Sequence, residues 1–263
     1  MTVYSLLHVI AMNIWVYSLL VLWTVIGVIL SPLQIVFLRW RHQWPVDRAV
    51  RHIIWMYGRG WLVLISPFVS FRREGLSPDQ LPERCVFVIN HLSFFDTYFM
   101  AGLPHSDVTF AVRSWPFKMF WYRLFMRLAN YLEVEDLSWQ ETTARGTEVL
   151  NHGGSVLFFP EGHRSRDGQI QRFYSGAFQL AVAAQCPVVP LCITGTDILL
   201  PPGRKSLRPC RVQLRILPPV AVDDYQYEGG HLALKKKVKS QMVEALKEMT
   251  DIPAEAAEMV SSC

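Results

Sequence analysis

The N-terminal segment constrains the fold of this chain more than any other part of the sequence. Residues 2–38 contain no Asp, Glu, Lys or Arg, and residues 10–30 are dominated by Leu, Val, Ile, Trp and Ala. A helix of about 20 such residues can cross the hydrocarbon core of a bilayer, because each residue adds about 1.5 Å. A cleavable signal peptide fits poorly, since no basic residue precedes the apolar run and no small-x-small cleavage site follows it. We therefore expect an uncleaved membrane anchor, the alternative being a helix of a soluble core.

The residues that follow this segment predict its orientation. A group of arginines opposed only by Asp47 comes directly after it: Arg39, Arg41, Arg48 and Arg51. Because basic residues are retained on the cytoplasmic side of a membrane, we expect the C-terminal part of the chain in the cytoplasm. A second apolar stretch, residues 53–69, contains Arg59 and Pro67 and is short for a crossing, so it predicts a helix in or against the membrane surface. Residues 1–71 are thus predicted to form a membrane-anchoring helical region.

Composition excludes several classes of protein. Only 18% of the residues are charged, below the usual ~25%, so a disordered chain is excluded. A net charge of +4 is too small to indicate a nucleic-acid partner, which needs a concentrated basic face. The five cysteines are scattered, without a C-x-x-C pair, so we expect neither a metal site nor a disulfide framework. We expect these cysteines to be reduced, and we therefore expect the folded part of the chain in the cytosol.

The composition and the hydrophobic pattern of the sequence change after residue 71. Residues 72–84 are polar and rich in turn formers, which predicts a linker. Short β-type runs then alternate with helical stretches, and this alternation predicts an α/β domain over residues 72–250, with a mixed, largely parallel sheet flanked by helices. The strands are expected at 85–89, 108–112, 155–159, 188–194 and 211–217, and the helices at 95–103, 116–131, 139–152, 174–185 and 231–249. Residues 251–263 are expected to form a C-terminal tail.

The last predicted helix carries a run of lysines: Lys235, Lys236, Lys237 and Lys239. A charge run on a helix usually forms a solvated face. The sharper interpretation is that these lysines hold anionic lipid head groups.

A first candidate site follows the predicted strand at 85–89. The sequence Asn90-His91-Leu92-Ser93-Phe94-Phe95-Asp96 lies where a buried strand ends, and ligands of open α/β sheets bind at that edge. Across a turn, Asp96 can contact one imidazole nitrogen of His91 and fix its tautomer. The other nitrogen is then free to remove a proton from a hydroxyl group. The alternative for such a pair is a packed or solvated histidine.

A second candidate site, residues 158–166, follows the predicted strand at 155–159. It contains Glu161, Gly162, His163, Arg164 and Arg166. Two arginines in a glycine-containing loop suit an anion, because guanidinium groups match phosphate oxygens in a bidentate fashion. The alternative is an ordinary surface turn. The chain contains no P-loop, no G-x-S-x-G nucleophile elbow and no G-x-G-x-x-G fingerprint.

Taken together, these segments resemble the glycerolipid acyltransferases, typified by 1-acylglycerol-3-phosphate acyltransferase. The resemblance rests on the blocks N-H-x₄-D at 90–96, F-P-E-G-x-R-S at 159–165, the segment 173–177 with Gly176, and V-V-P-L at 188–191, and it covers roughly residues 75–220. It implies transfer of a fatty acyl group from acyl-CoA or acyl-carrier protein to a hydroxyl of a membrane lysolipid, without a metal or another cofactor.

The resemblance also implies roles for individual residues. His91 would be the general base on the acceptor hydroxyl and Asp96 would orient it, with no acyl-enzyme intermediate. Arg164 would bind the acceptor phosphate in a loop shaped by Glu161 and Gly162, and residues 188–191 would lie along the acyl or thioester side. The wider substrate-binding set implied by the matching blocks is Asn90, Ser93, Arg113, Glu161, Gly162, Arg164, Ser165 and Gly176.

The chain departs from the family pattern at three places. His163 stands where Thr is usual, Ser175 stands where a basic residue is usual, and acidic residues at 133–136 stand where an Arg is expected. Fewer cations would weaken the hold on a compact phosphate. The acceptor is therefore expected to be 1-acyl-sn-glycerol-3-phosphate or a lysolipid with another head group, with Arg113, Arg166 and Arg172 as replacement charges. Two further alternatives are an inactive lipid-binding protein of the same fold and a hydrolase with Ser93 as nucleophile.

Overall fold

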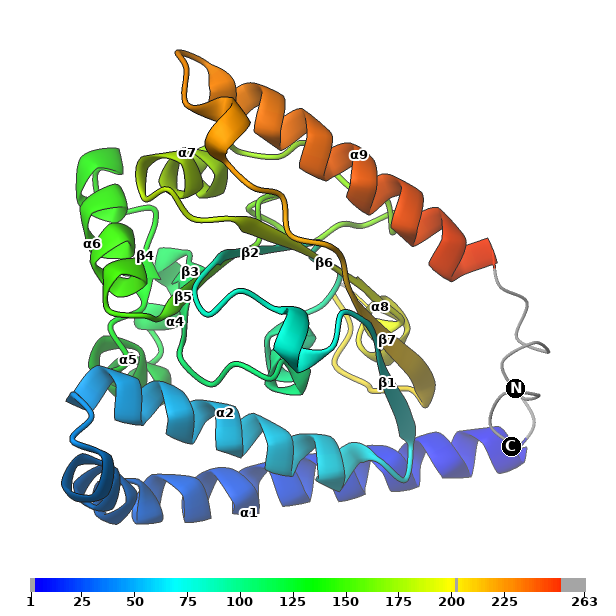
Figure 1. Ribbon diagram of the computed structural model, residues 1–263. Coiled ribbons are helices and arrows are strands. Elements are labelled where there is room, and N and C mark those ends of the chain that lie inside the picture. Colours follow the sequence, from blue (N-terminus) through cyan, green and yellow to red (C-terminus); the bar gives the residue numbers. More distant parts are fainter. Residues whose placement is uncertain (1–2, 202, 252–263) are drawn as a thin grey trace.

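A computed structural model of the protein describes residues 3–201 and 203–251. Of the tail predicted at 251–263, Asp251 belongs to the last helix and residues 252–263 lie outside the described residues. A seven-stranded sheet, in the order β1-β7-β6-β2-β5-β3-β4, forms the centre of the molecule, with helices on both of its faces (Figure 1). All neighbouring strands pair in parallel except β6 and β7, which pair antiparallel. The predicted α/β class, with a mixed and largely parallel sheet, is confirmed.

The strands are β1 (Val69–Gly75), β2 (Val86–Ile89), β3 (Val108–Val112), β4 (Leu132–Glu133), β5 (Ser155–Phe158), β6 (Val188–Thr194) and β7 (Cys210–Ile216). The α-helices are α1 (Val3–His42), α2 (Val46–Ile65), α3 (Asp96–Phe99), α4 (Ser114–Phe117), α5 (Phe120–Leu128), α6 (Trp139–Asn151), α7 (Gly176–Ala183), α8 (Thr196–Leu199) and α9 (Gly230–Asp251). Short 3₁₀ turns lie at Pro78–Gln80, Met100–Gly102 and Asp223–Tyr225.

The two faces of the sheet bury separate hydrophobic cores. In β2, Val86 and Val88 pack into the cluster beneath α6, α7 and α9, whereas Phe87 and Ile89 pack into the cluster that includes residues of α1, α2 and α3. All four side chains are fully buried. Strands that are buried on both faces have nearly continuous apolar sequences. The central strands were predicted from this pattern.

The edge strands were not predicted. Residues 72–75, expected to be part of a linker, belong to β1, which pairs in parallel with β7 and spans the boundary proposed between residues 71 and 72. Arg72 and Arg73 are exposed on this strand. Charged side chains are common on edge strands because they oppose further strand pairing, and here they gave the segment the composition of a loop.

Helices α1 and α2 form an antiparallel pair along one side of the sheet (Figure 1). The helix expected at 53–69 begins earlier, at Val46, and ends at Ile65. One face of α2 is buried against the domain through Ala49, Gly58 and Trp61, and α1 covers another face, so α2 is an inner helix of the pair. The segment Leu7–His42 is long and apolar enough to cross a membrane by length and composition, and in its most apolar window only 6% is buried.

A buried arginine attaches α2 to the sheet domain. The Arg51 side chain, 5% exposed, donates from Nε to Asp107 Oδ1 at 2.6 Å and from Nη1 to Asp47 Oδ2 at 2.9 Å and Ala129 O at 3.0 Å. Asp107 directly precedes β3, and Ala129 follows α5. Arg51, which the sequence indicated as a cytoplasmic charge beside the membrane, is thus a structural anchor.

The turn between β6 and α8 requires a glycine. Gly195 has φ +87°, and a Cβ there would lie 1.9 Å from the carbonyl oxygen of Arg211. Gly153 also has a positive φ, +82°, but a Cβ at that position would have no other atom within 4 Å. A substitution at Gly153 therefore tests the effect of backbone conformation on stability without a steric clash.

We expect Gly195→Ala to lower the free energy of unfolding by more than about 3 kcal/mol, because left-handed strain and a backbone clash add. Gly153→Ala should cost only the left-handed strain, about 1–2 kcal/mol. Thermal unfolding of both variants in the same detergent measures the difference. Equal shifts in Tm would contradict the assignment of a close backbone contact at Gly195.

Candidate active site

Two loops meet at one edge of the sheet. Strands β2 and β5 are parallel neighbours, so the loops that follow Ile89 and Phe158 emerge side by side at the carboxyl edge. The first loop carries His91, and the second carries Glu161 and Arg164. The two blocks that the sequence separates by seventy residues therefore form one site.

A buried carboxylate holds the His91 ring. Nδ1 of His91 lies 2.7 Å from Oδ2 of Asp96, and the same oxygen accepts the backbone N–H groups of Leu92 at 2.7 Å and Ser93 at 2.9 Å. Asp96 has no exposed surface, whereas the His91 side chain is 19% exposed. Because an ionised carboxylate only accepts hydrogen bonds, Nδ1 carries the hydrogen and Nε2 is left as a proton acceptor. The contact expected from the spacing of these residues is present.

The side chain of Glu161 joins the two loops. It is 1% exposed; Oε1 accepts the backbone N–H of His91 at 2.9 Å, and Oε2 accepts that of Gln171 at 2.8 Å. Burial raises the pKa of Glu161, and the two backbone hydrogen bonds act in the opposite direction. A second link runs from the backbone N–H of Ser165 to the carbonyl oxygen of His91, at 2.7 Å. Glu161 and Ser165 thus fix the main chain on both sides of the imidazole.

Asn90 and Ser93 use their polar groups inside the protein. Asn90 donates from Nδ2 to the carbonyl oxygen of Ile193 at 2.9 Å and accepts the N–H of Ile193 at 2.8 Å, which ties the His91 loop to β6. The Ser93 hydroxyl is buried and donates to the carbonyl oxygen of Leu200 at 3.0 Å. A serine with its proton committed to a backbone carbonyl, and no imidazole as hydrogen-bond partner, is not an activated nucleophile. This arrangement disfavours the hydrolase alternative.

The basic residues of the second loop face a common cavity with His91. Arg164 and Arg166 are exposed, line this cavity together with His163, and take part in none of the ion pairs among the described residues. Arg113 also lines the cavity, but it forms an ion pair with Glu135. Arg172, the other replacement charge expected from the sequence, does not line this cavity.

Glu135 explains one departure from the family pattern. Its carboxylate accepts the backbone N–H of Ser114 at 2.8 Å in addition to pairing with Arg113, and these hydrogen bonds lower the pKa of Glu135. An acidic residue in this segment therefore fixes the start of α4 and partly neutralises Arg113. The free cations at this end of the cavity are Arg164 and Arg166 among the described lining residues.

Two glycines of the predicted set have different surroundings. Gly162 has φ +70°, and a Cβ there would lie 2.8 Å from the ring of Tyr174, so the tight turn before Arg164 requires glycine. Gly176 begins α7 and lies outside the lining of the cavity; a Cβ there would be 3.3 Å from the ring of Trp139.

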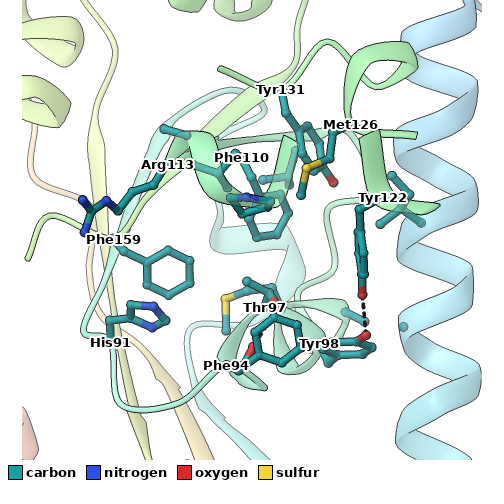
Figure 2. A pocket seen from close by; sticks show the side chains of 18 of the residues that line it. His91, Phe94, Thr97, Tyr98, Phe110, Arg113, Tyr122, Met126, Tyr131 and Phe159 are labelled. Atoms are coloured by element: carbon teal, nitrogen blue, oxygen red, sulfur yellow. Dashed lines mark hydrogen bonds between the residues drawn. The ribbon is translucent and has the colours of Figure 1, made fainter. Parts of the chain in front are cut away.

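A cavity of about 1490 Å³ opens beside His91 and continues between α2, α3, β3 and α5. In Figure 2, His91 and Phe159 lie on one side of this space, and Tyr122, Met126 and Tyr131 lie on the other. The hydroxyl groups of Tyr98 and Tyr122 are 2.6 Å apart, which links α3 to α5 at the wall (Figure 2). The wall is mainly aromatic and aliphatic, with Phe94, Tyr98, Phe110, Trp115, Tyr122, Met126, Tyr131 and Phe159 among its residues. The cavity thus has one basic end and a long apolar remainder.

The sequence did not identify this wall correctly. Residues 188–191 were expected along the acyl or thioester side of the site, but they lie in β6, where Val188, Val189 and Leu191 have no exposed surface, and none of them lines the cavity. That expectation is wrong because β6 is an interior strand. The signal that pointed to the true wall was the density of aromatic residues between 94 and 131. No group of three His, Cys, Asp or Glu residues in the described part of the chain is placed to hold a metal ion.

Comparison with known proteins gives consistent matches. Residues 71–194 match the family model described as Acyltransferase. A chloroplastic 1-acyl-sn-glycerol-3-phosphate acyltransferase of Brassica napus is 32% identical over 61% of this chain and 48% of its own length. The Escherichia coli 1-acyl-sn-glycerol-3-phosphate acyltransferase is 28% identical over 65% of this chain and 69% of its own length. The chain spans about half the length of the two chloroplastic relatives that it matches at 32% identity, from Brassica napus and Arabidopsis thaliana.

The fold also matches a solved structure. The crystal structure of the 1-acyl-sn-glycerophosphate acyltransferase PlsC from Thermotoga maritima superimposes with a TM-score of 0.78 and 22% identity, covering 94% of this chain and 98% of that one. The matched segment contains both candidate loops, with His91 and Asp96 in the first and Glu161 to Ser165 in the second. Residues 71–194 are therefore an acyltransferase domain similar to that of the glycerolipid acyltransferases.

Proposed function

We propose that this protein is a membrane-associated O-acyltransferase that moves a fatty acyl group from acyl-CoA or acyl-carrier protein to a lysoglycerophospholipid. We propose 1-acyl-sn-glycerol-3-phosphate as the acceptor and phosphatidate as the product, in line with the names of the relatives. The observation that carries the proposal is the His91–Asp96 pair at the basic end of a long apolar cavity. Both reactants have a phosphorylated end and an apolar chain, and the cavity offers complementary surfaces for each.

The proposed reaction needs a general base and no covalent intermediate. His91 Nε2 removes the proton from the acceptor hydroxyl, and the oxygen attacks the thioester carbonyl; the C–S bond breaks, and the thiolate leaves and takes up a proton. Asp96 keeps the hydrogen on Nδ1 and stabilises the imidazolium that forms. Because Glu161 and Ser165 fix the backbone of His91, the ring is positioned before substrate binds.

The acceptor phosphate is assigned to the second loop. Arg164 and Arg166 are exposed, lie at the same cavity as His91 and lack a carboxylate partner among the described residues. An arginine in this state can contact phosphate oxygens without first breaking an ion pair. The acyl chains are assigned to the apolar part of the cavity, which runs toward Met126 and Tyr131.

Membrane association is proposed from α1. Most of its apolar side chains are exposed, with Ile14, Val21, Ile29 and Leu33 more than half exposed. Thr24, Gly27 and Val28 of α1 also line the cavity, so a lipid at this helix has a route to His91. The arginines that follow the apolar segment in the sequence support a position of the catalytic domain on the cytoplasmic side.

His91→Ala is expected to lower kcat for acyl transfer by about 10²–10⁴-fold, the usual contribution of a general base. The measurement is transfer of labelled acyl group from acyl-CoA to 1-acyl-sn-glycerol-3-phosphate by the purified protein in detergent. His163→Ala is the matched control, since His163 lines the same cavity and has no carboxylate hydrogen-bond partner in the described residues. It should change kcat by less than about tenfold. Undiminished transfer by His91→Ala would refute the mechanism.

Arg164→Ala is expected to raise KM for 1-acyl-sn-glycerol-3-phosphate by about tenfold or more, the effect of losing one charge-assisted hydrogen bond. Monoacylglycerol, which lacks the phosphate, serves as the comparison acceptor and should be used equally well by wild type and variant. Equal losses with both acceptors would remove the phosphate contact from Arg164. A panel of other lysolipids assayed with the wild-type protein identifies the preferred head group.

A further inference from the structure

A second, smaller groove lies between residues 170–173 and α9. It has a volume of about 400 Å³ and is lined by Ile170, Gln171, Arg172, Phe173, Lys235, Lys236 and Lys239. Four of these residues are cations and none is acidic. None of the four takes part in an ion pair within the described residues. A concave surface lined by one sign of charge concentrates counter-ions, so the groove is suited to an anion with several negative charges.

Two of the lysines are held over the groove by the protein. Lys235 Nζ donates to Ser175 Oγ at 2.8 Å, and Lys239 Nζ lies 5.5 Å from the centroid of the buried Phe173 ring. Their ammonium groups are therefore directed toward the 170–175 segment. Lys235 also brings a cation to position 175, where the family pattern led us to expect a basic residue and the chain has serine.

The groove adjoins the site of acyl transfer. Gln171 lines both the groove and the large cavity, and its backbone N–H donates to Glu161, which in turn accepts the backbone N–H of His91. A molecule with its reactive end at His91 and an anionic end in the groove would pass Gln171. Neither the acceptor phosphate assigned to Arg164 nor the apolar cavity occupies this position.

The groove lies on the face of the sheet opposite the exposed apolar helix. Leu234, Val238 and Met242 of α9 belong to the core on the side of α6 and α7, whereas Met12 and Val16 of α1 belong to the other core. Figure 1 shows α9 and the α1–α2 pair on opposite sides of the sheet. Head groups of a membrane that contacts α1 would therefore not reach the groove. This placement favours a water-borne anion over the lipid head groups considered for the lysine run.

We propose that the groove binds the nucleotide phosphates of acyl-CoA while the thioester of the same molecule lies at His91. CoA carries a ribose phosphate and a diphosphate at the end remote from its sulfur, and multiple lysines and an arginine match such a group. The inference rests on the proposed acyltransferase function and names the donor and its binding site. It assigns α9 to recognition of the donor.

The test uses the full-length protein and a pair of charge-matched variants. Lys236→Glu/Lys239→Glu reverses two charges in the groove, and Lys237→Glu/Lys247→Glu reverses two exposed charges of α9 outside it. The single variant Lys236→Glu leaves the Lys239–Phe173 contact intact and guards against misfolding of the double variant. Donors are acyl-CoA and the corresponding S-acyl pantetheine, which has the thioester and no phosphate.

We expect the groove double variant to raise KM for acyl-CoA at least about tenfold, and Lys236→Glu to raise it to a smaller extent. The KM values for S-acyl pantetheine and for 1-acyl-sn-glycerol-3-phosphate should not change, and the control pair should stay within about twofold of wild type. Equal losses with both donors, equal losses in the control pair, or an unchanged KM for acyl-CoA would each overturn the proposal.

Calorimetric binding of CoA itself separates this proposal from the proposed function. At least tenfold weaker binding of CoA to the groove variants, with the control pair unchanged, supports the groove even if the wild-type protein transfers no acyl group. Equal CoA affinity in all variants overturns the groove even if wild-type transfer is robust. Raising the salt concentration should weaken CoA binding to the wild type more than to the groove double variant, because exposed charge contacts are screened.

Discussion

The double hydrogen bond accepted by Glu161 holds the candidate active site together. One buried carboxylate accepts the backbone N–H of His91 on one oxygen and that of Gln171 on the other, so it joins the loop after β2 to the loop after β5. Burying this carboxylate raises the pKa of Glu161, and the two N–H groups offset part of that effect. The same side chain thereby connects the His91 site and the loop of Arg164 and Arg166 to Gln171, which lines the groove.

The fold provides separate surfaces for the polar and the apolar part of an amphiphilic reactant. Parallel strands bring the polar loops to one edge of the sheet, and helices α2, α3 and α5 enclose an apolar space directly beside them. Two groups of cations at the cavity differ in their partners: Glu135 pairs with Arg113 and partly neutralises it, whereas Arg164 and Arg166 are exposed and line the same cavity as His91. The apolar helix α1 and the lysine-bearing helix α9 lie against opposite faces of the sheet, so the proposed lipid acceptor and the proposed water-soluble donor would approach from different sides.

Much of this arrangement could be predicted because the relevant signals are local. The strands β2, β3, β5 and β6 are mainly apolar, and both polar loops follow such strands directly. The edge strand β1 was missed because its exposed Arg72 and Arg73 resemble loop residues. The cavity wall was missed because Phe110, Met126 and Tyr131 have the composition of an ordinary core, and only packing shows that a space remains between them. The cation at Ser175 was also unpredictable, since Lys235 comes from a helix sixty residues away.

The attachment of α1 bears on how the protein meets a bilayer. The Asn13 side chain exchanges hydrogen bonds with the backbone of Leu207, at 2.9 Å and 2.7 Å, and Thr24 contacts Tyr57 of α2 at 2.7 Å. These two positions are separated by about 16 Å along the helix axis, and both are joined to the body of the protein. The axis of this stretch is therefore parallel to the surface of the domain. A bilayer that receives the exposed side of α1 would contact this part of the helix along its length. The charged loop at Arg204, Lys205 and Arg208 would limit how deeply the helix enters the bilayer.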